Sequence, residues 1–438
     1  MLGPPAAELP HPGAVARPPR GTPAPAPTTR ETSMITALRT GSAMALLSFA
    51  VLAQNPAASP EADAAMLAAA LDRFGADVMA HEPAGNLCYS PASTAMALLM
   101  CLAGAQGTTA AELHAALAPV GLDGDRLHAA AAALQGRLRR SVKGFELSCA
   151  QDLFVQQGKP LVPAFVELLR KRYGLSPRAV DFRKHVEAAR TAINARVAEL
   201  THGRIPDLIA PGQIEAATRL VLTNALYLKS DWLHPFAETG THDAAFHLDG
   251  GTQVQVPTMN LETTLEVADA ELGTIVRLPY VGGEFAFDLA LPKEAGQLDA
   301  TLRALVATTA GDWRGKLAPV PTGLALPRFR IENRMVLNDA LQAAGIKAAF
   351  SRDADFRGID GGDDALCIDL VVQKTWLDVA EKGTEAAAAT AVIVKSAAAL
   401  AGRPIRFDRP FAYALRDLRT GLCLFAGRCH DPRGSTGN

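Results

Sequence analysis

The chain has few of the features that mark an enzyme or a nucleic-acid-binding protein. Its 43 basic and 45 acidic side chains leave a formal net charge of −2, which argues against nucleic acid as the main partner. It contains no G-x-S-x-G, H-E-x-x-H, P-loop or G-x-G-x-x-G motif. The ten histidines are scattered, and none of them singles out a Ser-His-Asp set. We therefore expect no enzymatic activity, no metal ion and no cofactor.

Cysteine is also scarce, and N-x-S/T glycosylation sites are absent. No C-x-x-C pair occurs, and most of the cysteines lie in apolar runs, which favours buried free thiols over a disulfide framework or a metal site. Export would permit a bridge, so their pairing stays open. The six residues are Cys88, Cys101, Cys149, Cys367, Cys423 and Cys429.

The N-terminal part of the chain has two different compositions. Residues 1–33 are rich in Pro and Ala without periodicity and should be disordered. Residues 34–53 carry Arg39, an apolar run and a small-residue cleavage site before Gln54, the pattern of a secretory signal peptide. The alternative is a membrane anchor, for which the apolar run is short.

Four segments follow from this pattern: a disordered extension over 1–33, a signal peptide over 34–53, a linker over 54–61 and one domain over 62–433. Met34 would then be the true start of translation. We expect a secreted protein, extracellular or periplasmic, with no membrane attachment after the signal peptide is removed.

The domain contains both helical and strand-like patterns. Apolar periodicity and helix-start residues predict helices over 64–79, 90–104, 128–138, 163–173, 185–200 and 337–343, with another beginning near 107. Strand-like runs predict strands over 145–156, 256–259, 324–331, 370–379, 405–407 and 411–415, and a hairpin over 275–292 that turns at Gly282-Gly283. The basic cluster Arg137, Arg139, Arg140 and Lys143 is expected to be a solvated helix end.

The segment EKGTEAAAATAVIVKSAAALAG, residues 381–402, lies between two strand-like regions. An alanine run favours a helix by propensity, yet strands flank it. Such a segment is either a flexible exposed loop or a segment that can join a sheet as an additional strand, since side chains this small fit on both faces of a sheet.

Six motifs, in the same order along residues 62–433, resemble those of serpins, the serine protease inhibitor superfamily. EKGTEAAAAT resembles the hinge of the serpin reactive-centre loop. NLCYSPASTAMALLMCLAGAQGTTAAEL, INARVAELTHGRI and LVLTNALYLKSDWLHPF match in the first half of the domain, and ADFRGI and RFDRPFAYALRDLRTGLCLFAGRCHDP match in the second.

The resemblance implies an α+β serpin fold with a large central, mostly antiparallel sheet, about eight to nine helices, a smaller β-rich barrel half and an exposed reactive-centre loop over 381–402. The implied hinge consists of Glu381, Gly383, Thr384, Glu385, Ala386, Ala387, Ala388, Ala389 and Thr390. The implied shutter and breach, beneath and at the top of the sheet, consist of Ser90, Ser93, Asn224, Gln373 and Trp232. Gln373 stands where the family usually has His.

The implied activity is irreversible inhibition of a serine protease, which forms a covalent acyl complex with the cleaved loop while the loop inserts into the sheet. The small hinge residues favour this activity over a non-inhibitory binding, chaperone or storage role, which stays the alternative. The protein is expected to be a monomer.

Counting from the hinge places the cleaved bond between Ala397 and Ala398. Counting from Pro410-Phe411 places it between Ala399 and Leu400, and Lys395-Ser396 ranks below both. A small residue before the bond suits an elastase- or subtilisin-like protease.

Overall fold

The computed structural model describes residues 59–142, 144–271, 273–307, 313–362, 366–384 and 402–434. Contacts between Cα atoms group residues 55–438 into one compact unit. The expected signal peptide, and the loop from Glu385 to residue 401, lie outside the described residues. No helix within the described ranges is both long enough and apolar enough to cross a membrane.

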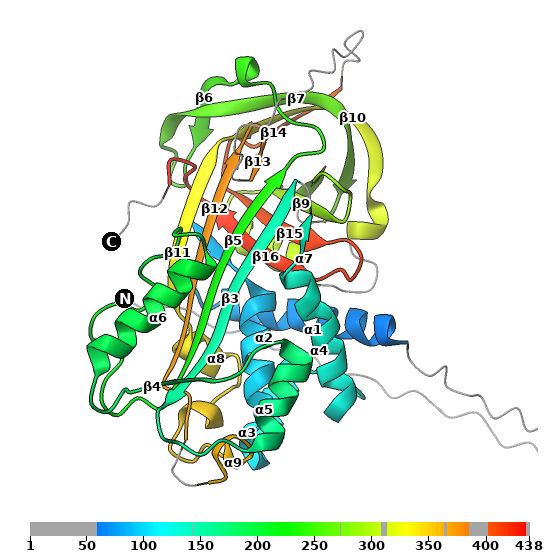
Figure 1. Ribbon diagram of the computed structural model, residues 1–438. Helices are drawn as coiled ribbons and strands as arrows, with labels where there is room; N and C mark the ends of the chain where they lie inside the picture. Colours follow the sequence, from blue (N-terminus) through cyan, green and yellow to red (C-terminus); the bar gives the residue numbers. More distant parts are fainter. Residues whose placement is uncertain are drawn as a thin grey trace, which may run out of the picture. The chain divides into compact units, whose positions relative to one another are not determined.

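Two sheets form the framework of this unit, and Figure 1 shows their strands. The nine-stranded sheet has the order β1-β16-β15-β9-β8-β7-β10-β14, with β6 paired to β7. Over the described residues it is open rather than a closed barrel. Its strands are β1 (Leu87–Tyr89), β6 (His242–His247), β7 (Gln253–Asp269), β8 (Gly273–Pro279), β9 (Phe285–Pro292), β10 (Ala318–Pro327), β14 (Arg403–Arg406), β15 (Phe411–Asp417) and β16 (Cys423–Cys429).

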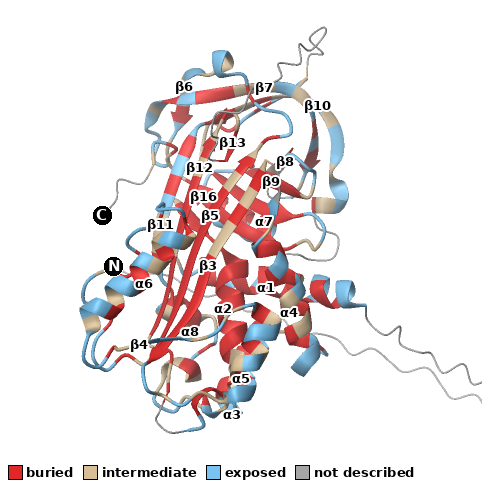
Figure 2. Ribbon diagram, in the orientation of Figure 1, coloured by how far each residue is buried: buried red, intermediate tan, exposed pale blue. Residues whose placement is uncertain are grey.

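The seven-stranded sheet has the order β11-β12-β13-β5-β3-β2, with β4 paired to β3. Most of its pairs are antiparallel, as expected, but β12 and β5 also pair directly and in parallel. Its strands are β2 (Ser141–Val142), β3 (Phe145–Gln156), β4 (Arg178–Val180), β5 (Leu220–Asp231), β11 (Phe329–Val336), β12 (Leu370–Ala380) and β13 (Gly383–Thr384). The central strands β3, β5 and β12 are buried along most of their length (Figure 2).

Nine α-helices occur in the described ranges, of which α7 packs against β9, β15 and β16 of the nine-stranded sheet, whereas α2 and α6 pack on the seven-stranded sheet. On one face, α2 packs against β3 and β5. On the other, apolar residues of α6 cluster with Phe154, Val221 and Leu370. The helices are α1 (Pro60–Met79), α2 (Pro91–Leu102), α3 (Gly107–Leu117), α4 (Gly124–Leu138), α5 (Pro163–Leu168), α6 (Val186–Leu200), α7 (Leu298–Val306), α8 (Asn338–Ala343) and α9 (Arg357–Asp360).

Two expectations from the sequence are wrong. The single strand expected over 324–331 is two strands, because β10 ends at Pro327 in one sheet and β11 begins at Phe329 in the other. The basic helix end is not simply solvated: Arg137 is buried, and its guanidinium donates to both carboxylate oxygens of Asp417 at 2.7 and 2.9 Å. The six cysteines are free thiols, as expected, and only Cys149 and Cys367 are partly exposed.

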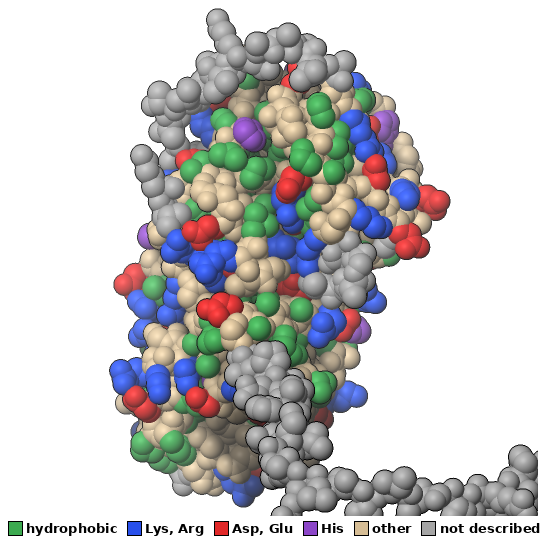
Figure 3. Space-filling view, turned by 90° about the vertical axis from the view of Figure 1, so that its right-hand side faces the viewer, with side chains coloured by type: hydrophobic (Ala, Val, Ile, Leu, Met, Phe, Trp, Pro, Cys, Tyr) green, Lys and Arg blue, Asp and Glu red, His purple; other side chains and the backbone are tan. Residues whose placement is uncertain are grey.

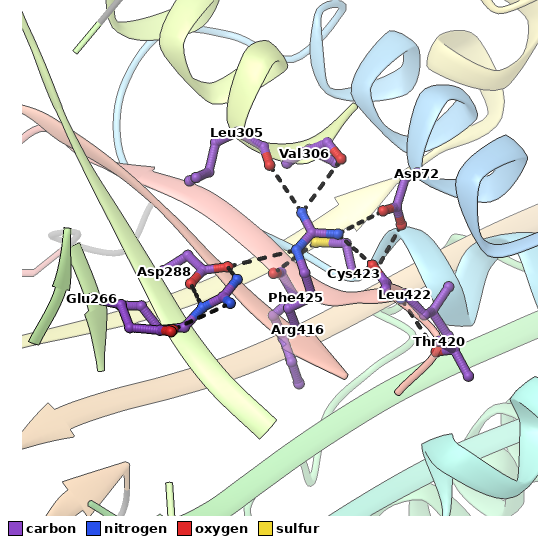
Figure 4. A network of polar contacts seen from close by, with 12 residues as sticks. Asp72, Glu266, Asp288, Leu305, Val306, Arg416, Thr420, Leu422, Cys423 and Phe425 are labelled. Carbon is purple, nitrogen blue, oxygen red and sulfur yellow. Dashed lines mark hydrogen bonds and ion pairs between the residues drawn. The ribbon is translucent and has the colours of Figure 1, made fainter. Parts of the chain in front are cut away.

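A buried ion network joins α1 to the nine-stranded sheet (Figure 4). Arg416 on β15 donates to Asp72 Oδ2 on α1 at 2.7 Å and to the Leu305 carbonyl on α7 at 2.9 Å. The Cys423 amide donates to the other oxygen of Asp72 at 2.8 Å. The side chains of Arg416 and Asp72 are 1% and 0% exposed, and without Asp72 the buried guanidinium would keep only Asp288, whose Oδ2 lies 3.6 Å from Arg416 Nε, as a charged partner among the described residues.

We predict that Asp72→Ala lowers the free energy of unfolding by about 3–5 kcal/mol, since it removes the nearer of the two carboxylates that face the buried guanidinium of Arg416. The matched control is Asp125→Ala, which removes a carboxylate that pairs with Arg172 but is 82% exposed and should lower the stability far less. Thermal unfolding of both variants measures the difference. Equal melting temperatures for the two variants would contradict this role of Asp72.

Candidate functional site

One end of the seven-stranded sheet holds a short strand wedged between two longer ones. β12 and β5 pair in parallel from Leu370 opposite Val221 to Trp376 opposite Tyr227. Beyond that point β13 separates them: Thr384 pairs with Val379 on one side and with Ser230 on the other. β13 is antiparallel to both neighbours, so the sheet is fully antiparallel where it is present.

Gly383 and Thr384 fit this position for different reasons. A Cβ atom at Gly383 would lie 1.8 Å from the Ser230 carbonyl oxygen, so only glycine allows so close an approach. Thr384 is fully buried, and its hydroxyl lies 2.7 Å from the Tyr280 hydroxyl. The Tyr280 ring stacks on Trp232 with a centroid distance of 4.5 Å.

The turn between β12 and β13 is held by the segment that follows β5. The Trp232 indole Nε1 donates to the Ala380 carbonyl at 2.9 Å, and the Trp232 amide donates to the Lys382 carbonyl at 2.9 Å. The Phe236 amide donates to the Glu381 carbonyl at 2.9 Å. Three consecutive carbonyls therefore have donors on one neighbouring segment, which fixes where the chain leaves β12.

The Glu381 side chain anchors the same turn to a third segment. Its Oε1 accepts hydrogen bonds from Arg328 Nε at 2.6 Å and from the Thr241 hydroxyl at 2.5 Å. Burial by itself raises the pKa of the Glu381 carboxyl, but the hydrogen bonds from Arg328 and Thr241 outweigh it and hold this pKa below its usual value. Arg328 is the residue between β10 and β11, where the chain changes sheets.

Midway along the sheet, Gln373 on β12 connects the sheet to the start of α2. Its Oε1 accepts from the Ser90 amide at 2.7 Å, and its Nε2 donates to the Ser90 carbonyl at 3.1 Å and to the Thr94 hydroxyl at 3.0 Å. Ser90 is also the N-cap of α2, where its hydroxyl accepts from the Ser93 amide at 3.3 Å. The amide of Gln373 therefore supplies both a donor and an acceptor at a fully buried position.

Ser93 makes the corresponding contact with β5. Its hydroxyl donates to Asn224 Oδ1 at 3.0 Å, and its carbonyl accepts from Gln151 Nε2 on β3 at 2.8 Å. Asn224 lies directly opposite Gln373 in the parallel pairing, and its buried Nδ2 has no hydrogen-bond partner among the described residues. The first turn of α2 thus bonds both strands that β13 separates farther along.

The structure brings the described members of the expected site into two groups. Ser90, Ser93, Asn224 and Gln373 form one group, which we call the mid-sheet cluster. Trp232, Glu381, Gly383 and Thr384 form the other, which we call the hinge cluster. Glu385, Ala386, Ala387, Ala388, Ala389, Thr390 and the candidate cleavage positions Lys395, Ser396, Ala397, Ala398, Ala399 and Leu400 lie outside the described residues.

The sequence reasoning missed four residues that contact these clusters. Thr94 follows Ser90 by one helical turn, and that spacing could have indicated its role. Tyr280, Thr241 and Arg328 are distant in sequence from the residues they bond, and no local pattern marks them.

Comparisons with known proteins agree with this arrangement. A family model described as "Serpin (serine protease inhibitor)" matches residues 69–432. The leukocyte elastase inhibitor of Bos taurus is 33% identical over 379 residues, which cover 84% of this chain and 99% of that protein. Among solved structures, Serpin48 of the insect Tenebrio molitor (28% identity, TM-score 0.73) covers 85% of this chain and 97% of its own. Human thyroxine-binding globulin (27% identity, TM-score 0.76) covers 85% and 100%.

We predict that Gly383→Ala pushes β13 away from β5, because the added methyl group would overlap the Ser230 carbonyl. Amide hydrogen exchange at residues 383 and 384 should accelerate roughly tenfold, the equivalent of about one lost hydrogen bond. Gly323→Ala on β10, where an added Cβ has no neighbour within 4 Å, is the control. Unchanged exchange in the Gly383 variant would mean that the close approach does not hold β13 in place.

We predict that acid loosens the hinge cluster through Glu381. Because its folded-state pKa is lowered, its contribution to stability is fully present above the unfolded pKa of about 4.3 and is lost as the pH falls through the folded value. Fluorescence of Trp232, followed in a variant that lacks the other two tryptophans, should change in this acid range. Glu381→Gln should abolish that transition, and its persistence in this variant would assign it to another group.

Proposed function

Because the chain belongs to the serpin family, we propose that it is an irreversible inhibitor of serine proteases that acts by loop cleavage and insertion. The single observation that carries this proposal is the position of β13, antiparallel between β12 and β5. The chain that follows Thr384 needs only to continue in the same direction to become a full strand of the sheet. It would replace a parallel pair with two antiparallel ones, which are slightly more stable per residue.

Such an extension requires no change of register. Thr384 lies opposite Val379 on β12 and Ser230 on β5, and these two residues are separated along the chain by the same number of positions as the partners in the parallel pairing of β12 with β5. Continued, that register places Ala386 between Leu228 and Leu377, which point toward the main apolar core. Small side chains at 386–389 suit this position because larger ones would have to displace packed core residues.

The same register brings Thr390 between Asn224 and Gln373 in the mid-sheet cluster. There the threonine hydroxyl could accept a hydrogen bond from Asn224 Nδ2, which has no described partner before insertion. Satisfying a buried donor is worth about 1–3 kcal/mol. The cluster would therefore favour the inserted state over the state described here.

Insertion explains how a protease would be trapped. The protease serine attacks the carbonyl carbon of the residue before the cleaved bond, an ester forms, and the peptide C–N bond breaks as the new amine takes a proton from the catalytic histidine. If the strand from Thr384 to Ala397 then enters the sheet, it carries the esterified protease roughly 45 Å at about 3.3 Å per residue. Hydrolysis of the ester needs an intact oxyanion hole, and distortion of that site in the trapped protease leaves the ester in place.

The proposed target is an elastase- or subtilisin-like serine protease. The preferred bond, Ala397-Ala398, and its alternative Ala399-Leu400 both present an alanine to the S1 pocket of the protease, and a shallow pocket accepts it. The similarity to the leukocyte elastase inhibitor of Bos taurus supports this class. Cleavage at Lys395-Ser396 would instead suit a trypsin-like protease, and this bond ranks below both alanine bonds.

A binding, chaperone or storage protein of the same fold, without inhibitory activity, is the alternative. The similarity to human thyroxine-binding globulin, which was solved with its ligand, shows that a serpin can bind a small molecule. The small hinge residues and the position of β13 favour inhibition, and formation of a covalent adduct distinguishes the two.

We also propose that the inhibitor is a secreted monomer, with residues 34–53 as its signal peptide and residues 62–433 as the mature domain. The apolar run before Gln54 supports this proposal. N-terminal sequencing of the exported protein should begin near residue 54, and a mature protein that keeps residues 34–53 would contradict it. Gel filtration should give a single species near the mass of one chain.

We predict that incubation with pancreatic elastase yields an adduct that resists boiling in SDS, and that mass analysis of the released C-terminal peptide identifies the cleaved bond. Thr384→Arg should convert the inhibitor into a substrate, because a guanidinium cannot occupy the buried site beside Tyr280. Loss of adduct should exceed roughly tenfold and be matched by an increase in cleaved chain.

Thr384→Ser keeps the hydroxyl and is the control, with adduct yield close to that of the unaltered protein. Circular dichroism shows whether each variant is folded. A folded Thr384→Arg variant that still forms the adduct at full yield would contradict the insertion mechanism.

A further inference from the structure

The outer edge of β3 has a gap in its pairing. β2 pairs with β3 only at Phe145 and Glu146, and β4 pairs with it only from Phe154 to Gln156. Between these two short strands, no strand of the described part of the chain pairs with β3 on this side over residues 148–153. At about 3.3 Å per residue this edge is roughly 20 Å long.

The direction of the free backbone groups follows from the bonds at either end of the gap. The Gln156 amide donates to the Arg219 carbonyl, on the β5 side, whereas the Leu147 amide donates to the Arg140 carbonyl, on the outer side. Since backbone groups alternate along a strand, those of Cys149 and Gln151 point outward. No backbone partner contacts them there among the residues with described positions, and an unpaired edge of this kind accepts an added strand.

A cavity of about 420 Å³ occupies this gap. Arg139 and the loop at Leu175 line one side of it, and Arg196 and Leu200 of α6 line the other. Figure 3 shows the face turned toward the right of Figure 1, where lysine and arginine side chains gather across the middle. Along this part of β3, Ser148 and Cys149 are partly exposed and residues 150–153 are buried, and three arginines, Arg139, Arg178 and Arg196, line the cavity.

The charges that line the cavity leave an excess of positive charge. Asp152 is buried; its Oδ1 accepts from Arg178 Nε at 2.9 Å, and its Oδ2 lies 3.6 Å from Arg196 Nε without a hydrogen bond. Glu146 is occupied by His202, with 2.9 Å between Oε1 and Nε2. Arg139 is exposed and forms no described ion pair, so it is available to an anionic group.

We propose that this cavity, bounded by β2, β3 and β4, binds an extended acidic peptide segment of a partner protein. The segment adds a strand to β3: its backbone pairs with Cys149 and Gln151, and a carboxylate contacts Arg139. Backbone pairing with an exposed sheet edge gives affinity in such complexes, and side-chain contacts give specificity. A simple anion would use the arginines but leave the strand edge unpaired.

The strand that would receive this peptide also contacts the mid-sheet cluster. On its inner side, Cys149 Sγ lies 3.6 Å from the Ser93 hydroxyl, and Gln151 bonds the Ser93 carbonyl. A bound peptide would therefore cover the route from solvent to the partly exposed thiol of Cys149. The rate at which the Cys149 thiol is alkylated should therefore show whether the peptide is bound.

The test measures alkylation of Cys149 by N-ethylmaleimide, mapped by mass spectrometry, in the full-length protein. The probe is the blocked peptide acetyl-Glu-Thr-Glu-Val-Glu-amide at millimolar concentration, short enough to fit the gap. Because burial raises the pKa of the Cys149 thiol, the reaction is run near pH 8.5, or about the ordinary thiol pKa. Cys367, also partly exposed but outside the cavity, is the internal control.

The peptide should slow alkylation of Cys149 in a saturable way and leave Cys367 unchanged. Arg139→Gln should weaken the apparent affinity roughly fivefold, the effect of one exposed ion pair. Lys171→Gln removes one exposed charge that does not line the cavity and should have no effect.

Three outcomes would overturn the proposal. The first is the absence of protection of Cys149. The second is equal protection by the same peptide with every backbone amide N-methylated, which retains the charge but cannot pair as a strand. The third is equal protection by inorganic sulfate, which would make the cavity a simple anion site.

Discussion

The parallel pairing of β12 with β5 is the contact on which the rest of the structure depends. These two strands lie at the centre of the seven-stranded sheet, yet they come from opposite halves of the domain and have no covalent connection nearby. At one end β13 already separates them, and its residues bond to both. A sheet built in this way can be opened along one line without disturbing the pairs on either side of that line.

Buried polar contacts hold the two strands in register on the face covered by α2. Gln373 bonds the backbone of Ser90, and Asn224 bonds the hydroxyl of Ser93, so one helix N-terminus bridges both strands. These bonds are directional and fully buried, and separating the strands breaks at least some of them. We infer that the hydrogen bonds of the mid-sheet cluster oppose separation of β12 from β5. We also infer that the Asn224 Nδ2 group, which has no hydrogen-bond partner among the described residues, favours insertion of a new strand that can accept its hydrogen bond.

The sequence predicted most of the helices and strands, because apolar periodicity and helix caps are local signals. The strand over 145–156 and the N-cap at Ser90 are found as expected. Local signals could not show that the chain changes sheets at Arg328, since the alternation continues through that residue. They also could not show that Arg137 is buried against Asp417, because its partner lies 280 residues away.

The same limit applies to the candidate site. The hinge composition and the motif around Ser90 indicated which residues matter, and the structure shows how they are held. The ion pair of Glu381 with Arg328, the contact of Thr384 with Tyr280 and the gap along β3 all depend on segments distant in sequence. Gln373 is an example. The sequence identified it as a departure from the family pattern, but only the structure shows that its side-chain amide accepts a hydrogen bond from the Ser90 amide and donates one to the Ser90 carbonyl.

The central claim is that this fold is less stable with its loop outside the sheet than with the loop inserted. The most direct measurement compares the melting temperature of the intact chain with that of the chain cut by elastase between Lys395 and Leu400. A strand added at the centre of the sheet should raise the melting temperature by at least about 10 °C, the equivalent of roughly 8 kcal/mol for a domain of this length. A cut chain that melts at the temperature of the intact one, or below it, would contradict the account.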